Sequence, residues 1–200
     1  MRTKTQAQNT FPIVVLLSGN GSNLQAIINA TQPAPCHVAI NAVISDRATA
    51  FGLQRAKDAG LVTHVLAAGT HANRQTYDHA LAKLIDCYQP KLVVLAGFMR
   101  ILSAEFVAHF HPYLINIHPS LLPKYKGLNT HQRVLDAGDS VHGCSVHFVD
   151  EELDSGSIIA QAQCTVNAND SVDSLKKKVQ QLEHQLYPLV IQRFAARELP

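Results

Sequence analysis

Residues 11–29 read FPIVVLLSGNGSNLQAIIN and contain one complete structural unit. The run Phe11–Leu17 is apolar and rich in β-branched residues, and it has the length of a buried strand. A turn rich in glycine and polar residues follows at residues 18–23, and a helical pattern then runs from about residue 23 to residue 29. Strands that lead through a turn into a helix are the repeating units of parallel sheets, so this stretch predicts an α/β fold.

The same alternation of short apolar runs and helical patterns continues along the chain. Further strands are expected at residues 38–44, 62–66, 92–96, 114–118, 143–149 and 157–166. Helices are expected from about residue 49 to Gly60, from residue 73 to residue 88 before Pro90, and from residue 171 to residue 194. The pattern predicts a single doubly wound, mostly parallel sheet of Rossmann-like type over residues 11–200. Residues 1–10 are polar and lack periodicity, which is typical of a flexible lead-in.

Composition is that of a soluble globular protein, with 46% hydrophobic and 16% charged residues. Lys and Arg number 17 against 15 Asp and Glu, and the basic residues are scattered apart from residues 176–178, so a nucleic-acid-binding surface is not expected. That lysine run lies in the amphipathic last helix and is expected to be a solvated face. The four widely spaced cysteines and the lack of an apolar run of about 18 to 20 residues favour a cytoplasmic protein without a membrane segment.

Sheets of this type bind ligands beyond the carboxyl ends of their strands, so the residues after each strand are the candidates for chemistry. At residues 18–23, glycines and the free amides of a helix start favour an anion such as phosphate. The stretch has neither a Walker ending nor the third glycine of a dinucleotide fingerprint, so a plain turn is the alternative. Residues 96–102 join a glycine to large apolar side chains, which suits either a flat heteroaromatic ring or simple core packing.

Asn116 and His118 follow the period of two of a strand and therefore share one face near the carboxyl edge of the sheet. An amide donor and a protonated imidazole that converge on one carbonyl oxygen would stabilise an oxyanion in acyl transfer. The acidic loop at residues 150–154 could bring one carboxylate toward His118 and favour the charged imidazolium of a general acid. On these residues alone, a structural histidine and a solvated acidic turn remain alternatives.

Together, these stretches resemble the folate-dependent glycinamide ribonucleotide formyltransferases from about residue 11 to the end of the chain. Residues 116–125, NIHPSLLPKY, are similar to the catalytic signature of the wider group of formyltransferases that use 10-formyltetrahydrofolate. Residues 18–23, 96–102 and 147–154 match at the spacing of the family. The combination of these motifs is far more specific for the family than any one motif alone.

The resemblance implies transfer of the formyl group of 10-formyltetrahydrofolate to the glycine amine of 5'-phosphoribosylglycinamide, a step of de novo purine synthesis. 10-Formyltetrahydrofolate would be a co-substrate, no metal is expected, and the partners would be these small molecules, with no nucleic acid or membrane. Asn116 and His118 would stabilise the oxyanion, and Asp154 would hold the imidazole of His118 charged. Monomer and homodimer both remain open.

Substrate contacts are also implied by the resemblance, residue by residue. The ribonucleotide would be bound by Gly21, Ser22, Asn23, Gln180 and Glu183. The folate would be bound by Arg74, Met99, Arg100, Ile101, Leu102, Asn116, Asp150, Glu151, Glu152, Leu153 and Asp154. The family usually has proline where this chain has Lys126 and histidine where it has Asn129, so a more mobile loop is expected there.

Other kinds of protein are less compatible with the sequence. The histidines at 109 and 111 lack the spacing of a zinc site, and Ser145 lies in no GxSxG elbow. Formyltransferases that act on initiator transfer RNA, and hydrolases of the same folate, have an additional domain for which 200 residues are expected to leave no room. A catalytically silent folate- or nucleotide-binding module would not need to keep Asn116, His118 and Asp154 together.

Overall fold

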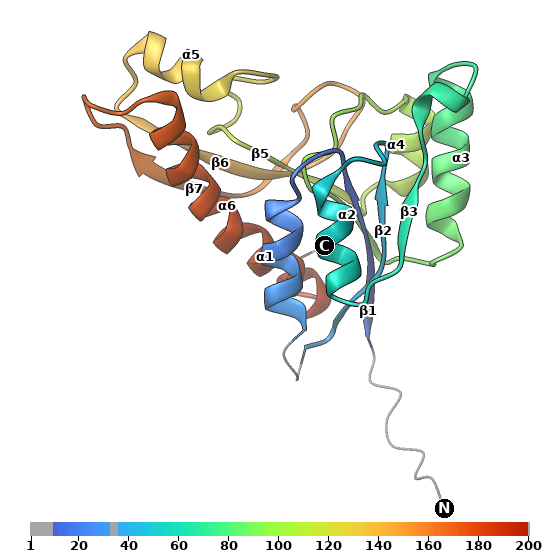
Figure 1. Cartoon of the computed structure of the whole chain (residues 1–200). Helices are drawn as coiled ribbons and strands as arrows, with labels where there is room; N and C mark the ends of the chain where they lie inside the picture. The colour runs from blue at the N-terminus through green and yellow to red at the C-terminus, as the bar shows by residue number, and fades with distance from the viewer. Residues whose placement is uncertain (1–9, 33–35, 200) are drawn as a thin grey trace, which may run out of the picture.

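The structure is a computed structural model that describes residues 10–32 and 36–199, in which the chain forms a seven-stranded sheet with helices on both faces (Figure 1). Residues 1–9 of the expected lead-in lie outside the described residues. The strands are β1 (Phe11–Leu17), β2 (Val38–Ser45), β3 (Thr63–Val65), β4 (Leu92–Leu95), β5 (Leu114–His118), β6 (Val141–Phe148) and β7 (Ile158–Thr165). The helices are α1 (Ser22–Thr31), α2 (Phe51–Asp58), the short 3-10 helix η1 (Ala68–Thr70), α3 (Arg74–Asp86), α4 (Ala104–Phe110), α5 (Thr130–Ala137) and α6 (Val172–Ala195).

The strand order is β3-β2-β1-β4-β5-β6-β7, and the first five strands are parallel. β6 pairs with β5 in the antiparallel sense, and β7 does the same with β6. The chain winds outward from β1 in one direction and then from β4 in the other, so the switch point of the sheet lies between these two strands. The prediction of a doubly wound, mostly parallel sheet with a mixed edge is confirmed.

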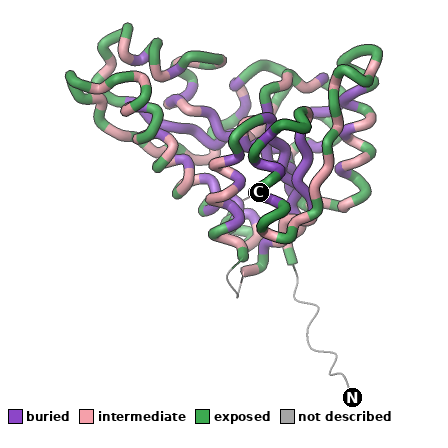
Figure 2. The backbone as a smooth tube through the Cα atoms, in the orientation of Figure 1, coloured by how far each residue is buried: buried purple, intermediate pink, exposed green. Residues whose placement is uncertain are grey.

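The core has two layers because the central strands are buried on both sides (Figure 2). On β1, Ile13, Val15 and Leu17 belong to the layer under α1, α2 and α6, whereas Val14 and Leu16 belong to the layer under α3 and α4. This explains why the strand reads as a continuous apolar run rather than an alternating one. With helices over both faces, the strand ends are the part of the sheet that remains open to ligands.

Two short helices, α4 and α5, were not expected from the sequence. They have seven and eight residues, less than the window over which helical periodicity becomes distinct. α4 begins at the capping residue Ser103, whose hydroxyl accepts a hydrogen bond from the amide of Phe106. The other expected elements are present with ends shifted by up to about two residues, the usual uncertainty at element boundaries.

Helix α6 is the longest helix of the described chain, and Tyr187 fixes it to the strands that carry the candidate site. The buried Tyr187 hydroxyl lies 2.9 Å from the carbonyl oxygen of Leu95 on β4 and 3.1 Å from that of Ile115 on β5. On the outer side of α6, Lys176 and Lys177 are exposed, in agreement with a solvated face. Of the helices in residues 10–32 and 36–199, none is both long and apolar enough to cross a membrane.

The turn between β1 and α1 depends on a direct backbone contact between two glycines. Gly21 has a φ of +73°, a left-handed conformation, and a Cβ placed on it would lie 2.5 Å from the Cα of Gly52 on α2. An atom cannot be accommodated at that distance, and the opposing atom belongs to the backbone of a helix. The start of α1 is therefore held against α2 in a way that only glycine allows.

We expect Gly21→Ala to lower the free energy of unfolding by about 2 to 4 kcal/mol, because the left-handed strain and the overpacking add up. Gly60→Ala is the matched control, since Gly60 has a φ of +72° but no atom within 4 Å of the added Cβ. The control should lose only the conformational part, about 1 to 2 kcal/mol. Equal losses in urea unfolding of the two variants would show that the contact with Gly52 is unimportant.

Candidate active site

The two loops at the switch point are joined by Ser18. Its amide donates to the carbonyl oxygen of Gly97 at 3.0 Å, and its hydroxyl accepts from the amide of Met99 at 2.8 Å. Ser18 is buried, and Gly97 has a φ of +77°. The loop after β1 and the loop after β4 thus lie side by side, and the two stretches that the sequence singles out are neighbours.

The first of these loops leads into the start of α1. Gly21 is the N-cap residue, and among the described residues no side chain caps this helix end. The amides of the first turn are therefore available to an anion. Ser22 and Asn23 occupy this turn, and the Nδ2 atom of Asn23 donates to Oε2 of Glu183 on α6 at 3.0 Å. The last helix thus contributes to the same corner of the sheet as the first.

Glu183 is a buried carboxyl group beside this turn. Burial raises the pKa of Glu183 to about 7, while the hydrogen bond from Asn23 acts in the opposite direction. Gln180 is partly buried one turn earlier on α6. Within the described residues, Oδ1 of Asn23 is buried and finds no hydrogen-bond partner. The corner therefore offers both acceptors and donors to a polar ligand.

Beyond β4, the loop at residues 96–102 presents two apolar side chains to solvent. Met99 and Ile101 are 60% and 62% exposed, whereas Leu102 is partly buried. The guanidinium of Arg100 lies 4.5 Å from the ring centroid of Tyr77 on α3, so this side chain packs against the protein. Of the residues whose core packing was the alternative, Phe98 and Leu102 do pack into the core, whereas Ile101 remains exposed beside Met99 and could face a ring. Arg74 is exposed at the first position of α3.

The acidic loop after β6 has one residue that turns inward. Its first four residues, Asp150, Glu151, Glu152 and Leu153, are exposed, whereas Asp154 is buried. Asp154 has a φ of +50°, a left-handed conformation that aspartate tolerates better than most residues. This backbone bend aims the carboxylate of Asp154 away from solvent.

The carboxylate of Asp154 meets the imidazole of His118. The Oδ2 atom of Asp154 lies 3.3 Å from Nδ1 of His118, and both side chains are only 7% exposed. The Nε2 atom of His118 lies 2.9 Å from the carbonyl oxygen of Tyr125, which can only accept a hydrogen bond, so Nε2 carries a proton. A charged imidazolium would therefore find an acceptor for each of its two N–H groups.

Asn116 lies two residues before His118 on β5 and pairs across the strands with His147 on β6. The Nδ2 atom of Asn116 is 3.2 Å from Nε2 of His147, and Oδ1 of Asp154 is 3.7 Å from the same nitrogen. Asn116, His118 and Asp154 are thus brought together, with His147 between them. The sequence alone does not single out His147, although it is the first residue of the stretch 147–154 that matches the family.

The loop that departs from the family pattern is attached to this centre. The amide of Gly127 donates to Oδ2 of Asp154 at 2.9 Å, and the ammonium of Lys126 bonds to the hydroxyl of Ser155. Asn129 adopts a left-handed conformation, with a φ of 58°, and is the N-cap residue of α5. Lys126 and Asn129 therefore have structural roles in this chain, at positions where the family usually has other residues.

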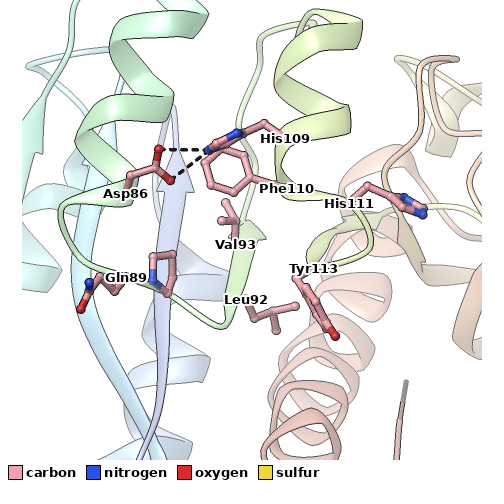
Figure 3. A pocket seen from close by; sticks show the side chains of 9 residues that line it. Asp86, Gln89, Leu92, Val93, His109, Phe110, His111 and Tyr113 are labelled. Atoms are coloured by element: carbon pink, nitrogen blue, oxygen red, sulfur yellow. Dashed lines mark hydrogen bonds and ion pairs between the residues drawn. The ribbon is translucent and has the colours of Figure 1, made fainter.

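A second pair of histidine and aspartate lies at the opposite ends of the central strands. It borders a pocket of about 320 Å³ beside the amino ends of β4 and β5 (Figure 3). Nε2 of His109 is 3.1 and 3.0 Å from the two carboxylate oxygens of Asp86, and both side chains are about half exposed. His111 points away from this pair. In residues 10–32 and 36–199, no three His, Cys, Asp or Glu side chains are arranged to hold a metal ion.

The raised pKa of Glu183 predicts how stability depends on pH. The folded carboxyl retains its proton up to about pH 7, whereas its ordinary value is 4.5, so its contribution to stability is present below pH 4.5 and is lost as the pH rises through 7. We expect Glu183→Gln to exceed the wild type in free energy of unfolding by roughly 3 kcal/mol at pH 8, with the difference vanishing below pH 4.5. Urea unfolding across this range measures it, and a difference that does not change with pH would contradict the assignment.

Comparison with known proteins adds an independent line of information. The family model described as formyl transferase matches residues 12–191. Phosphoribosylglycinamide formyltransferase of Escherichia coli (strain K12) is 56% identical over 183 residues, which are 92% of this chain and 86% of that protein.

Solved structures agree with the sequence match. The phosphoribosylglycinamide formyltransferase from Coxiella burnetii superposes with a TM-score of 0.90 at 52% identity, covering 94% of this chain and 88% of that one. Glycinamide ribonucleotide transformylase 1 from Symbiobacterium toebii superposes with a TM-score of 0.93 at 38% identity, covering 100% and 94%. With a family match over most of its length and this likeness in sequence and fold, the chain belongs to the formyl transferase family.

Proposed function

We propose that this enzyme transfers the formyl group of 10-formyltetrahydrofolate to the glycine amine of 5'-phosphoribosylglycinamide, giving formylglycinamide ribonucleotide and tetrahydrofolate. The observation that carries the proposal is the buried contact between His118 Nδ1 and Asp154 Oδ2, 3.3 Å, two residues along the strand from Asn116. A relative with this name is 56% identical over 183 residues, which supports the choice of substrates.

The ribonucleotide would lie along the start of α1. Its phosphate would accept hydrogen bonds from the amides of Gly21, Ser22 and Asn23, since the helix start favours an anion. Its hydroxyl and amine groups would face Gln180 and Glu183 on α6. The buried carboxyl of Glu183 is suited to accept hydrogen bonds from a ribose or glycinamide group.

The folate would lie on the other side of the switch point. Its ring would contact the exposed apolar side chains of Met99 and Ile101, and the loop backbone around Arg100 and Leu102. Arg74 is positively charged and exposed, and we expect it to meet a negatively charged part of the molecule. The acidic loop of Asp150, Glu151, Glu152, Leu153 and Asp154 would close the pocket from β6.

The chemistry would take place between these two sites, at the end of β5. The glycine amine attacks the formyl carbon, and the negative charge that develops on the formyl oxygen is stabilised by N–H groups of Asn116 and His118. In the folded protein the Nε2–H of His118 donates to Tyr125, so the substrate oxygen would take the place of that carbonyl. The bond between the formyl carbon and the folate nitrogen then breaks, and His118 gives a proton to that leaving nitrogen. Asp154 keeps the imidazole charged and orients a water, which takes the proton that the attacking amine loses and returns it to His118.

We further propose that the reaction needs no metal and no covalent intermediate. The enzyme would act in the cytoplasm on small molecules, as a monomer or a homodimer, without binding nucleic acid or membranes. Residues 11–200 would work as one formyltransferase domain.

His118→Ala and Asp154→Asn should each lower kcat by about 100- to 1000-fold with little change in KM, because each removes a contribution made mainly in the transition state. The matched controls are His109→Ala and Asp86→Asn, which alter the exposed histidine and aspartate at the opposite edge of the sheet (Figure 3). Both controls should retain wild-type rates. A wild-type kcat in His118→Ala or Asp154→Asn would refute the assignment.

One assay separates the proposed activity from its alternatives. The formation of tetrahydrofolate from 10-formyltetrahydrofolate is followed with and without 5'-phosphoribosylglycinamide. We expect turnover only when the ribonucleotide is present. Turnover without it would indicate a hydrolase, and no turnover in either case would indicate a binding module without catalytic activity.

A further inference from the structure

We propose that His147 is a positioning residue that sets the orientation of the Asn116 side-chain amide, so that an N–H group rather than the amide oxygen is directed at the formyl oxygen. The inference rests on the proposed function, in which Asn116 donates to that oxygen, and it assigns a role to a residue outside the group of Asn116, His118 and Asp154. Three contacts around the ring of His147 carry it.

The first contact fixes the tautomer of His147. Its Nδ1 atom lies 2.7 Å from the carbonyl oxygen of Phe148, the next residue on β6. A carbonyl oxygen can only accept, so Nδ1 must carry a hydrogen. In a neutral imidazole, the other nitrogen, Nε2, is then without a hydrogen and can only accept.

The second contact passes this constraint to Asn116. The Nε2 atom of His147 is 3.2 Å from Nδ2 of Asn116, so the amide group must donate one N–H to it. The opposite orientation of the amide would bring Oδ1 of Asn116 against a nitrogen lone pair, with two acceptors face to face. One N–H of Asn116 is therefore held by His147, and the second remains for the substrate.

The third contact concerns charge. The Oδ1 atom of Asp154 lies 3.7 Å from Nε2 of His147, too far for a hydrogen bond. Oδ2 of Asp154 is instead engaged with His118 and with the amide of Gly127. Burial lowers the pKa of His147, against the opposing effects of the Phe148 carbonyl and Asp154, with His118 a further lowering influence. When His147 is neutral, His118 is the only one of the two histidines that can form an ion pair with the carboxylate of Asp154.

The backbone of β6 holds this ring in place. Asn116 and His147 are direct partners in the antiparallel register of β5 and β6. On the other side of β6, the register with β7 shifts between Val146 and His147. Bulges of this kind re-aim side chains and are frequent next to active sites. His147 is also buried, so its ring has little freedom to turn away from Asn116.

The tautomer can be measured directly on the wild-type protein. Two-dimensional ¹⁵N–¹H spectra of the histidine side chains, assigned with His147→Gln, distinguish a protonated Nδ1 from a protonated Nε2. We expect His147 to be neutral with its proton on Nδ1 at the pH of the assay. A proton on Nε2, alone or together with one on Nδ1, would overturn the inference, whether or not any variant folds.

Two substitutions separate the two nitrogens of His147. In His147→Asn, the short amide can still donate to the Phe148 carbonyl but offers nothing at the position of Nε2. In His147→Gln, the longer side chain places an amide oxygen near the position of Nε2 and can accept from Asn116. We expect kcat to fall by about 10- to 100-fold in His147→Asn, with KM nearly unchanged. This is the loss typical of removing a residue that orients a directly acting group. His147→Gln should recover most of the lost rate, and equal rates in the two variants would contradict the role.

A double substitution tests whether the effect passes through Asn116. In an Asn116→Ala background, His147→Asn should lower kcat little further, because the group that it orients is already absent. A second loss of the same size would show that His147 acts independently of Asn116. If the wild-type protein has no formyltransferase activity, the proposed function fails, and the tautomer measurement still decides the state of His147.

Discussion

The buried carboxylate of Asp154 joins segments of the chain that meet only in the folded sheet. It contacts His118 on β5, and it accepts a hydrogen bond from Gly127 in the loop before α5. A carboxylate removed from water is costly unless such partners compensate for the lost hydration. The partners of Asp154 are assembled only when strand, loop and histidine are in place, and the proposed chemistry uses this same arrangement.

The topology of the sheet brings the two proposed ligand regions to this carboxylate. Because strands are added to the sheet in opposite directions from β1 and from the parallel neighbour β4, the loops after these two strands adjoin, and Ser18 links them through Gly97 and Met99. The bond between Asn23 and Glu183 adds the last helix to the first. A reaction between two substrates requires two binding regions with a reacting centre between them, and we propose that the carboxyl ends of these strands supply them.

Much of the fold could be predicted because buried parallel strands leave a strong signal. The bounds of Phe11–Leu17 and Leu114–His118 agree with the structure residue for residue. The first is an apolar run that ends at the polar Ser18, and the second is ended by Pro119. Helix α4 is only seven residues long and has its apolar side chains in one turn and a half, which gives no repeat to detect.

The sequence could predict those residues of the candidate site whose position follows from a strand. Asn116 and His118 share a strand face by spacing, whereas the approach of Asp154 depends on a left-handed backbone bend that spacing does not encode. His147 depends on the register between β5 and β6, which no local pattern gives. The stacking of Arg100 on Tyr77 is likewise a contact between distant segments, so the sequence could assign that arginine only by resemblance.

We propose that the carboxyl ends of β1, β4 and β5 form one reaction centre for two substrates. A crystal structure with 5'-phosphoribosylglycinamide and a folate whose N10 substituent cannot be transferred is the decisive measurement. We expect the phosphate at the amides of Gly21 to Asn23 and the folate ring beside Met99 and Ile101. The glycine amine should lie next to the N10 substituent, within reach of Asn116 and His118. A ternary complex with the amine and N10 on different edges of the sheet, or with the reacting atoms far from His118, would contradict it.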